Sequence, residues 1–235
     1  MNIQGFQKLT LLDYPGKVAC TVFTGGCNLR CPFCHNAGLV NTPDAYPNAE
    51  SDVLEYLSRR KGLLDGVCIT GGEPLLQNGL ADFAGKIKEM GYLLKLDTNG
   101  SLPERLREIL KTGLFDYVAM DVKSSPAGDR TAIGVDTDFS LFEESMEILK
   151  SSGIDHEFRT TAVKGIHTAA DIAEAARLVG DGEKYFIQRF VDSGNLIGTG
   201  CSSFSEEESL ELLAAARRFV PGAELRGIDT DDTDC

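Results

Sequence analysis

The sequence has no long apolar run, no surplus of basic residues and no second group of closely spaced cysteines. No window contains the roughly 18 apolar residues that a membrane-spanning helix needs. The first residues, "MNIQGFQKLTLLDYPGK", lack the basic segment and apolar run of a signal peptide. These absences predict a cytoplasmic protein that does not use a membrane as partner.

The charge balance argues against general nucleic-acid binding. The chain has 23 Lys and Arg against 36 Asp and Glu, a net charge of −13, whereas phosphate recognition needs basic patches. Much of the acidity lies in "FSEEESLELL" and in the tail 228–235, "IDTDDTDC". We interpret both as solvated surface, although an acidic face could also favour a basic protein partner.

Seven cysteines in a chain without an export signal do not predict a disulfide framework. Cys20 and Cys68 lie in apolar, strand-like runs and are expected to be buried as small hydrophobic residues. Cys201 and Cys235 are interpreted as incidental thiols. The other three cysteines are clustered and need a separate explanation.

The order of elements predicts an α/β fold. Short apolar runs alternate with amphipathic stretches, and no Gly/Pro-rich linker divides the 235 residues, so we expect one domain over 1–235 with a core of about 17–227. This pattern fits either an open doubly wound sheet or a curved (β/α) barrel. The expected strands are 17–24, 66–70, 92–98, 116–122, 155–163, 184–190 and a final 223–228; the expected helices are 51–64, 79–91, 102–113, 140–153, 168–180 and 205–220.

Polar motifs follow each of the first six expected strands. They are the cysteine loop, "GGEP", "DTNG", "DVK", "RTTAVKG" and "QRF". Because the carboxyl ends of parallel strands share one rim, where α/β proteins build their ligand sites, we expect one large site.

The cysteine loop "GGCNLRCPFCHN" places Cys27, Cys31 and Cys34 within eight residues. Thiolates favour iron–sulfur clusters or zinc, but a structural zinc site usually has four protein ligands. His35 follows Cys34 directly, which is poor geometry for the fourth ligand. The pattern therefore favours a cluster with one open coordination position.

Together with "GGEP", the stretch "CNLRCPFC" resembles the signature of radical S-adenosylmethionine (SAM) enzymes, and the order of motifs matches over nearly the whole chain. The resemblance implies a partial (β/α)6 TIM-like barrel. It implies that Cys27, Cys31 and Cys34 hold a [4Fe–4S] cluster whose remaining iron is chelated by SAM.

The resemblance also implies which residues contact the cofactors. Phe33 would lie against the adenine, Glu73 near the SAM ammonium, and Arg159 at the SAM carboxylate. Some related enzymes bind a monovalent cation near the positions of Asp97 and Thr98, and the sequence leaves this open here. The full set of expected cofactor-binding residues is Phe33, His35, Gly71, Gly72, Glu73, Asp97, Thr98, Asn99, Lys123, Arg159 and Gln188.

Simpler interpretations remain open for some of these residues. "NG" readily forms a turn, and Lys123 and Arg159 could form ion pairs at the rim. His156 and His167 are expected to be surface or structural residues. No side chain is expected to act as general acid or base, since the cluster and SAM carry the chemistry.

The stretch "LTLLDYPGKVACTVFTGGCNLRCPFCHN" is similar to activating proteins of glycyl-radical enzymes, above all those of anaerobic ribonucleoside-triphosphate reductase, and also to pyruvate formate-lyase activating enzyme. The implied reaction is reductive cleavage of SAM, followed by hydrogen abstraction from a glycine of the partner enzyme. Flavodoxin or ferredoxin would be the electron donor.

Two alternatives are kept. One is a small-molecule radical SAM enzyme such as 7-carboxy-7-deazaguanine synthase, which "CHN" and "DYPG" disfavour. The other is a zinc-binding interaction module without catalysis, which explains neither "GGEP" nor the order of the strands.

Overall fold

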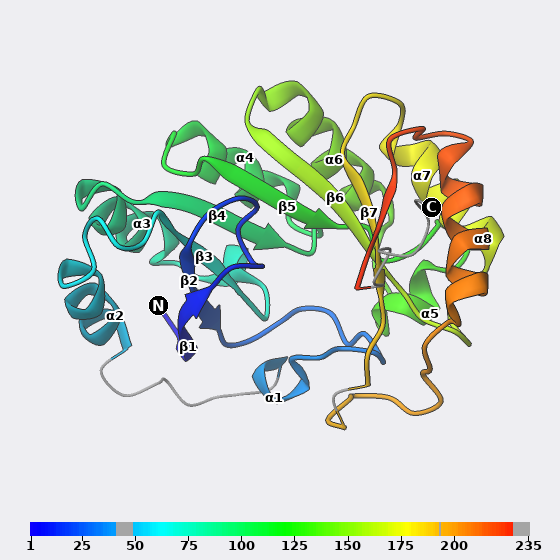
Figure 1. The fold of residues 1–235 in the computed structure, drawn as a ribbon, viewed down its shortest axis with the longest axis horizontal. Helices are drawn as coiled ribbons and strands as arrows, with labels where there is room; N and C mark the ends of the chain where they lie inside the picture. The colour runs from blue at the N-terminus through cyan, green and yellow to red at the C-terminus, as the bar shows by residue number, and fades with distance from the viewer. Residues whose placement is uncertain (41–48, 193, 228–235) are drawn as a thin grey trace, which may run out of the picture. The chain divides into compact units, whose positions relative to one another are not determined.

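The computed structural model describes residues 1–40, 49–192 and 194–227, and these form a mixed α/β fold. Its eight strands follow chain order in one sheet (Figure 1). The seven predicted strands are all present, and one further strand precedes them. The strands are β1 (Ile3–Thr10), β2 (Ala19–Thr24), β3 (Gly66–Gly71), β4 (Leu93–Thr98), β5 (Tyr117–Asp121), β6 (Asp155–Ala162), β7 (Tyr185–Arg189) and β8 (Glu224–Arg226).

The unpredicted strand β1 is the antiparallel edge of the sheet, paired with β2. Its sequence, "IQGFQKLT", is only partly buried and has no continuous apolar run. The pairs β2–β3, β3–β4, β4–β5, β6–β7 and β7–β8 are parallel. Central strands covered on both faces read as apolar runs, whereas an edge strand does not, which is why the sequence signal missed β1.

The six predicted helices are present, and two short ones are additional. Helix 51–64 was predicted too long at its carboxyl end, since the helix stops at Ser58. The helices are α1 (Ala37–Val40), α2 (Ala49–Ser58), α3 (Leu80–Glu89), α4 (Pro103–Lys111), α5 (Asp129–Ile133), α6 (Ser140–Ser152), α7 (Ala169–Val179) and α8 (Glu206–Arg217), with a 3₁₀ turn η1 (Pro74–Leu76). The additional helices α1 and α5 are too short for a 3.6-residue period to show.

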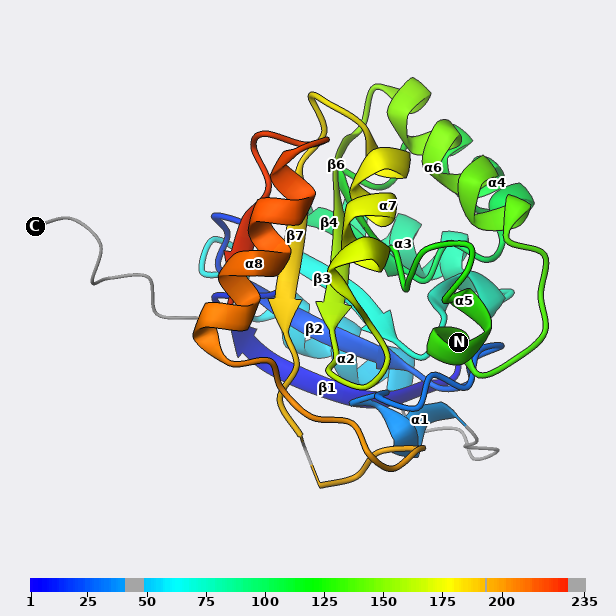
Figure 2. The same ribbon diagram turned by 90° about the vertical axis from the view of Figure 1, so that its right-hand side faces the viewer.

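The chain divides into two compact units. The first unit comprises Met1–Leu29, Asn36–Met120 and Glu144–His156; the second comprises Arg30–His35, Asp121–Glu143 and the residues from Glu157 onward. In the first unit α3 packs against β4, and α2 packs against α3 and β1. In the second unit α7 packs against α8, and α8 against β8 (Figure 2).

Burial follows the expected pattern in the central strands. Val67 and Ile69 of β3 and Leu94 and Leu96 of β4 are fully buried. The predicted burial of Cys20 and Cys68 is confirmed, since both have no exposed surface. Cys201 is half-buried, and Cys235 and the predicted tail 228–235 lie outside the described residues.

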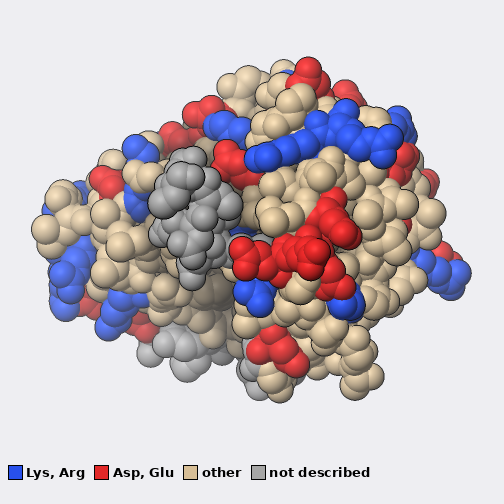
Figure 3. Space-filling model, turned by 45° about the vertical axis from the view of Figure 1, so that its right-hand side comes forward, with Lys and Arg blue, Asp and Glu red and all other residues tan. Residues whose placement is uncertain are grey.

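Acidic side chains gather near the centre of the face shown in Figure 3, among mostly uncharged surface. Within the described ranges, no helix combines the length and the apolar character that crossing a membrane would require.

Candidate cofactor site

The first unit brings together motifs that follow three neighbouring parallel strands. Cys27 comes after β2 and Glu73 after β3, while Asp97 and Thr98 end β4 and Asn99 follows it. Because these strands run parallel, their carboxyl ends lie at one edge. The predicted clustering of the motifs at a rim is therefore observed within this unit.

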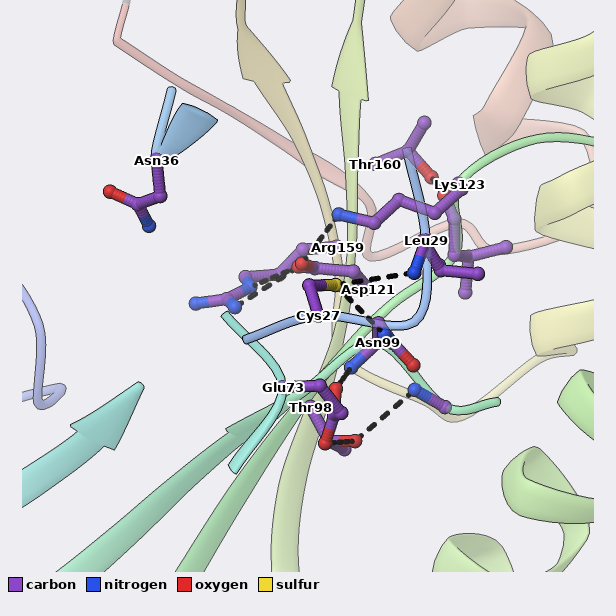
Figure 4. Close-up of polar contacts among 12 residues, drawn as sticks. Cys27, Leu29, Asn36, Glu73, Thr98, Asn99, Asp121, Lys123, Arg159 and Thr160 are labelled. Carbon is purple, nitrogen blue, oxygen red and sulfur yellow. Dashed lines mark hydrogen bonds and ion pairs between the residues drawn. The ribbon is translucent and has the colours of Figure 1, made fainter. Parts of the chain in front are cut away.

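Glu73 is fully buried and joins the ends of β3 and β4. Its Oε1 accepts hydrogen bonds from the Leu75 N–H at 3.0 Å and from the Thr98 hydroxyl at 2.9 Å, and its Oε2 accepts one from the Asn99 N–H at 2.7 Å (Figure 4). A buried carboxylate must be paired with donors of this kind. Glu73 thus holds the segments that follow β3 and β4 together. Its contact with SAM stays a prediction.

The glycines of "GGEP" let two stretches of backbone touch. Gly71 has φ +114°, and a Cβ on Gly72 would lie 2.0 Å from the carbonyl oxygen of Gly26. The Glu73 N–H donates to that same carbonyl at 2.9 Å. We predicted that Gly71 and Gly72 contact the cofactor. The structure shows that the absence of side chains here lets the backbone of the loop before Cys27 pack closely against them.

The sulfur of Cys27 is surrounded by hydrogen-bond donors. The Leu29 N–H lies 3.4 Å and the Asn99 side-chain amide 3.7 Å from Sγ. Asn99 is held in turn by Asn28, whose Oδ1 accepts from its amide at 3.1 Å, and by Ser101, whose N–H donates to its Oδ1 at 2.9 Å. Such donors stabilise a thiolate or a cluster-bound sulfur.

Asp97 forms an ion pair with Lys95, two residues earlier on the same face of β4. The Thr98 hydroxyl accepts from the Gly100 N–H at 3.2 Å, so the Asn-Gly turn is present and coexists with the bonds to Glu73. Asn36 donates to the carbonyl oxygen of Gly71 at 3.0 Å.

In the second unit the cysteine loop is held by two segments that the sequence had not singled out. The Arg30 N–H donates to the carbonyl of Ile133 at 2.8 Å, and the Gly198 N–H donates to that of Pro32 at 2.8 Å. A Cβ on Gly134 would lie 2.1 Å from the Arg30 carbonyl oxygen. Position 134 therefore has room for glycine alone. The segments around Gly134 and Gly198 thus help to set the conformation of the loop that carries Cys31 and Cys34.

The predicted aromatic neighbours of the cysteines lie in two environments. Phe33 is buried, and its ring meets His167 edge-on at a centroid distance of 5.8 Å. His35 lies beside Phe190 at 5.4 Å. Burial first, and then the charge of Lys123, lowers the pKa of His35. Phe33 therefore packs against the protein on at least one side, and its predicted contact with adenine stays a prediction.

Asp121, Lys123 and Arg159 form one ion-pair group. Asp121 lies 2.8 Å from the Lys123 ammonium and 3.0 Å from the Arg159 guanidinium (Figure 4). Burial would raise the pKa of Asp121, but the two cations outweigh it and lower that pKa to about 2. Burial would lower the pKa of Lys123, but Asp121 and then Cys31 outweigh it, so that pKa is raised. The ion pairs that the sequence left open as the simpler interpretation of Lys123 and Arg159 are present, and the group keeps a net positive charge.

His167 was assigned no role from the sequence, yet it is buried and tied to two predicted site residues. Its Nδ1 accepts from the Val163 N–H at 3.0 Å, so its Nε2 carries the proton and donates to the Lys123 carbonyl at 2.7 Å. Burial lowers the pKa of His167. The only sequence signal was its position shortly after an expected strand.

Gln188 is half-buried in β7, aligned with Thr161 of β6 and Arg226 of β8. Its predicted contact with cofactor stays a prediction.

The donor set fits an iron–sulfur cluster by type. Three thiols stand in one loop of the sequence. Amide groups donate to the Cys27 sulfur, and Lys123 lies near Cys31 and Cys34, whose charges help to raise its pKa. In the part of the chain that the structure describes, no three Cys, His, Asp or Glu side chains are grouped closely enough to hold a metal ion. The ligand assignment therefore rests on donor type and environment.

Comparison with known proteins gives the family. Residues 21–179 match the model of the radical SAM superfamily. A protein of Methanocaldococcus jannaschii, named "putative glycyl-radical enzyme activating enzyme", is 30% identical over 236 residues, covering 97% of this chain and 96% of the relative. The pyruvate formate-lyase-activating enzyme of Clostridium pasteurianum is 36% identical over 127 residues, 52% of each chain.

Solved structures agree on the fold. Streptococcus suis SuiB bound to S-adenosylmethionine matches 87% of this chain and 49% of its own, with a TM-score of 0.67 at 16% identity. A domain of a pyruvate-formate lyase-activating enzyme from Bacteroides vulgatus matches 69% of this chain and 99% of its own, with a TM-score of 0.56 at 19% identity. The predicted fold class, the partial TIM-like barrel of radical SAM enzymes, is confirmed. The chain belongs to the radical SAM superfamily, and as an enzyme of that superfamily it uses a [4Fe–4S] cluster and S-adenosylmethionine.

Proposed function

We propose that the protein is an activating enzyme that generates the glycyl radical of a partner enzyme. The observation that carries this proposal is the M. jannaschii relative named for that activity, because the match spans 97% of this chain and 96% of the relative. The pyruvate formate-lyase-activating relatives support it over about half of the chain.

Within this proposal Cys27, Cys31 and Cys34 hold the cluster. A [4Fe–4S] cluster bound there supplies the single electron that cleaves SAM. The chain's own residues bind and orient. The Asn99 amide donates to the Cys27 sulfur, and Glu73 fixes the turn that carries Asn99.

The group of Asp121, Lys123 and Arg159 is proposed to bind the SAM carboxylate. The two cations Lys123 and Arg159 share the single carboxylate of Asp121, so one positive charge is left over. The group can therefore bind a further anion while both ion pairs stay in place. The guanidinium of Arg159 offers paired donors suited to a carboxylate. Phe33, His35, Gly71, Gly72, Asp97, Thr98 and Gln188 complete the proposed cofactor contacts.

The proposed partner is anaerobic ribonucleoside-triphosphate reductase, with flavodoxin or ferredoxin as electron donor. The support is the resemblance of the stretch from Leu9 to Asn36 to activating proteins of that reductase.

An anaerobic activation assay tests the proposal. Reconstituted protein, SAM and a reductant are incubated with candidate glycyl-radical enzymes, beginning with the anaerobic ribonucleotide reductase, and electron paramagnetic resonance detects a glycyl doublet. We expect a doublet that is lost in Cys31→Ala. A doublet with a different glycyl-radical enzyme would correct the partner and keep the activity.

The second candidate, a small-molecule radical SAM enzyme, has its own observation. The 7-carboxy-7-deazaguanine synthase of Hyperthermus butylicus is 35% identical, but over 40% of this chain. Cleavage of SAM to 5′-deoxyadenosine without a doublet on any partner, together with turnover of a small molecule, would replace the activase proposal by this one.

A further inference from the structure

Strand β4 contains a lysine in the interior of the first unit. The Lys95 side chain is 1% exposed, although lysine is almost never fully buried unless it is paired. It stands in the middle of the strand, aligned with Cys68 of β3 and Tyr117 of β5. No role for it followed from the sequence.

The ammonium of Lys95 is engaged by two groups on the same face of the sheet. It pairs with the carboxylate of Asp97, whose side chain is 14% exposed, and its Nζ lies 3.9 Å from the Cys68 sulfur. Residues i and i+2 of a strand point to one face, so the strand itself sets this pair. A buried ammonium has a large desolvation cost unless a counter-charge offsets it, and Asp97 supplies that charge.

Asp97 is connected to the proposed cluster ligand through its two following residues. Thr98 and Asn99 both donate to the carboxylate of Glu73, and Asn99 also donates to the Cys27 sulfur at 3.7 Å. The position of Asp97 at the end of β4 therefore helps to set where the Asn99 amide lies. An unbalanced charge on Asp97 would draw in water or a cation and displace this turn.

We propose that Lys95 is a positioning residue that serves as a built-in cation for Asp97 and thereby holds the turn of residues 97–99 against Glu73 and Cys27. The sequence left open whether a small monovalent cation binds near Asp97; in this chain an ammonium tethered to β4 takes that place. The protein then needs no added monovalent cation to form its SAM site. When Lys95 is shortened, the vacated space becomes a site for a small cation such as ammonium, methylammonium or potassium.

The test measures SAM binding to the cluster-reconstituted protein under anaerobic conditions, in choline chloride and in the chlorides of ammonium, methylammonium and potassium. Wild type is expected to bind SAM equally in all four salts. Lys95→Ala is expected to bind at least tenfold more weakly in choline chloride and to recover at least half of that loss in ammonium or methylammonium. Lys95→Met, of similar length but uncharged, is expected to lose affinity without recovering fully, because its side chain fills the space.

The proposal would be overturned if Lys95→Met bound SAM as wild type does, or if Lys95→Ala were weakened equally in every salt. Either result would mean that Lys95 contributes only packing and not its charge.

A thermal-unfolding cycle keeps the proposal testable if Lys95→Ala does not fold. Lys95→Met and Asp97→Asn are each expected to lower the midpoint, and the double variant is expected to lower it by less than the sum, since it removes both charges. Additive losses would show no coupling and would contradict the proposal. Neither readout depends on a glycyl radical, so the outcome is independent of the proposed function.

Discussion

The buried imidazole of His167 donates a hydrogen bond from Nε2 to the backbone carbonyl oxygen of Lys123 at 2.7 Å. The same ring packs edge-on against Phe33, so one side chain supports both the "DVK" motif and the loop of Cys31 and Cys34. The Val163 N–H bond to Nδ1 requires the neutral tautomer, and protonation of Nδ1 would break it.

We predict that His167 makes the stability of the protein depend on pH. Burial lowers its pKa below the ordinary 6.5, although the charge of Asp171 opposes this and that of Lys123 adds to it. A lowered folded-state pKa means that the stabilisation is complete above about pH 6.5 and is lost as pH falls toward the folded-state value. Urea unfolding of the apoprotein at several values from pH 8 to pH 5 measures this.

The variant His167→Phe is expected to unfold with about 1–3 kcal/mol less free energy at pH 8, because it leaves the Val163 N–H and the Lys123 carbonyl without this partner. It should also lose part of the fall in stability below pH 6.5. His156→Gln is the matched control, since His156 forms a local bond with the carbonyl of Ile154, two residues earlier in the chain. An unchanged pH profile in His167→Phe would contradict the prediction.

We predict opposite effects for two Gly→Ala changes in the first unit. In Gly72→Ala the new Cβ would lie 2.0 Å from the carbonyl oxygen of Gly26, a backbone atom that cannot move away easily. The expected loss in free energy of unfolding is about 1–3 kcal/mol. In Gly85→Ala, within α3, nothing lies within 4 Å of the new methyl, and helix propensity predicts a gain of about 0.5–1 kcal/mol. Denaturant titration compares them, and equal effects would count against the steric explanation.

The strands were predictable because each buried parallel strand forms an apolar run, such as "GVCIT" of β3. Strand β1 was not, because only two of its eight residues are buried. Thr168 and Ser205 are the N-cap residues before helices α7 and α8, and both form reciprocal capping boxes. Such local signals are visible in the sequence, whereas the four or five residues of α1 and α5 are too few to show a period.

The candidate site was predictable where chemistry requires a residue type, and not where packing does. Cys27, Glu73 and Arg159 stand in motifs and were named in advance. Lys95 acts through its burial, and His167 acts through burial and through Phe33 and Lys123, which are distant in the sequence. Lys95 looks like one polar residue within an apolar strand, and only the structure shows that it meets Asp97 and not solvent.

We predict that Asn99 tunes the bound cluster through the Cys27 sulfur. Hydrogen bonds to cluster sulfurs help to set the reduction potential, and the Asn99 amide lies 3.7 Å from Sγ. Asn99→Ala is therefore expected to shift the potential to a more negative value in a redox titration without SAM. Asn36→Ala is the control, since that amide donates to the Gly71 carbonyl. A shift of equal size in both variants would mean that the potential responds to loop distortion and not to the sulfur bond.

The last prediction concerns the second unit, where Arg226 of β8 forms a bidentate pair with Glu157 of β6. Both N–O distances are 2.8 Å, the Glu157 side chain is 1% exposed, and the guanidinium lies 3.3 Å from the ring centroid of Phe186. Arg226→Met removes this partner from a buried carboxylate, and we expect a loss of about 2–3 kcal/mol in free energy of unfolding. That is below the ~3–5 kcal/mol of a fully buried pair, because the Arg226 side chain keeps 34% of its surface exposed.

The control is Arg177→Met, which breaks an exposed helix pair with Glu174 and should cost under about 0.5 kcal/mol. Adding Glu157→Gln to Arg226→Met should recover part of the loss, and a double variant no more stable than Arg226→Met would show that the buried charge is not its cause.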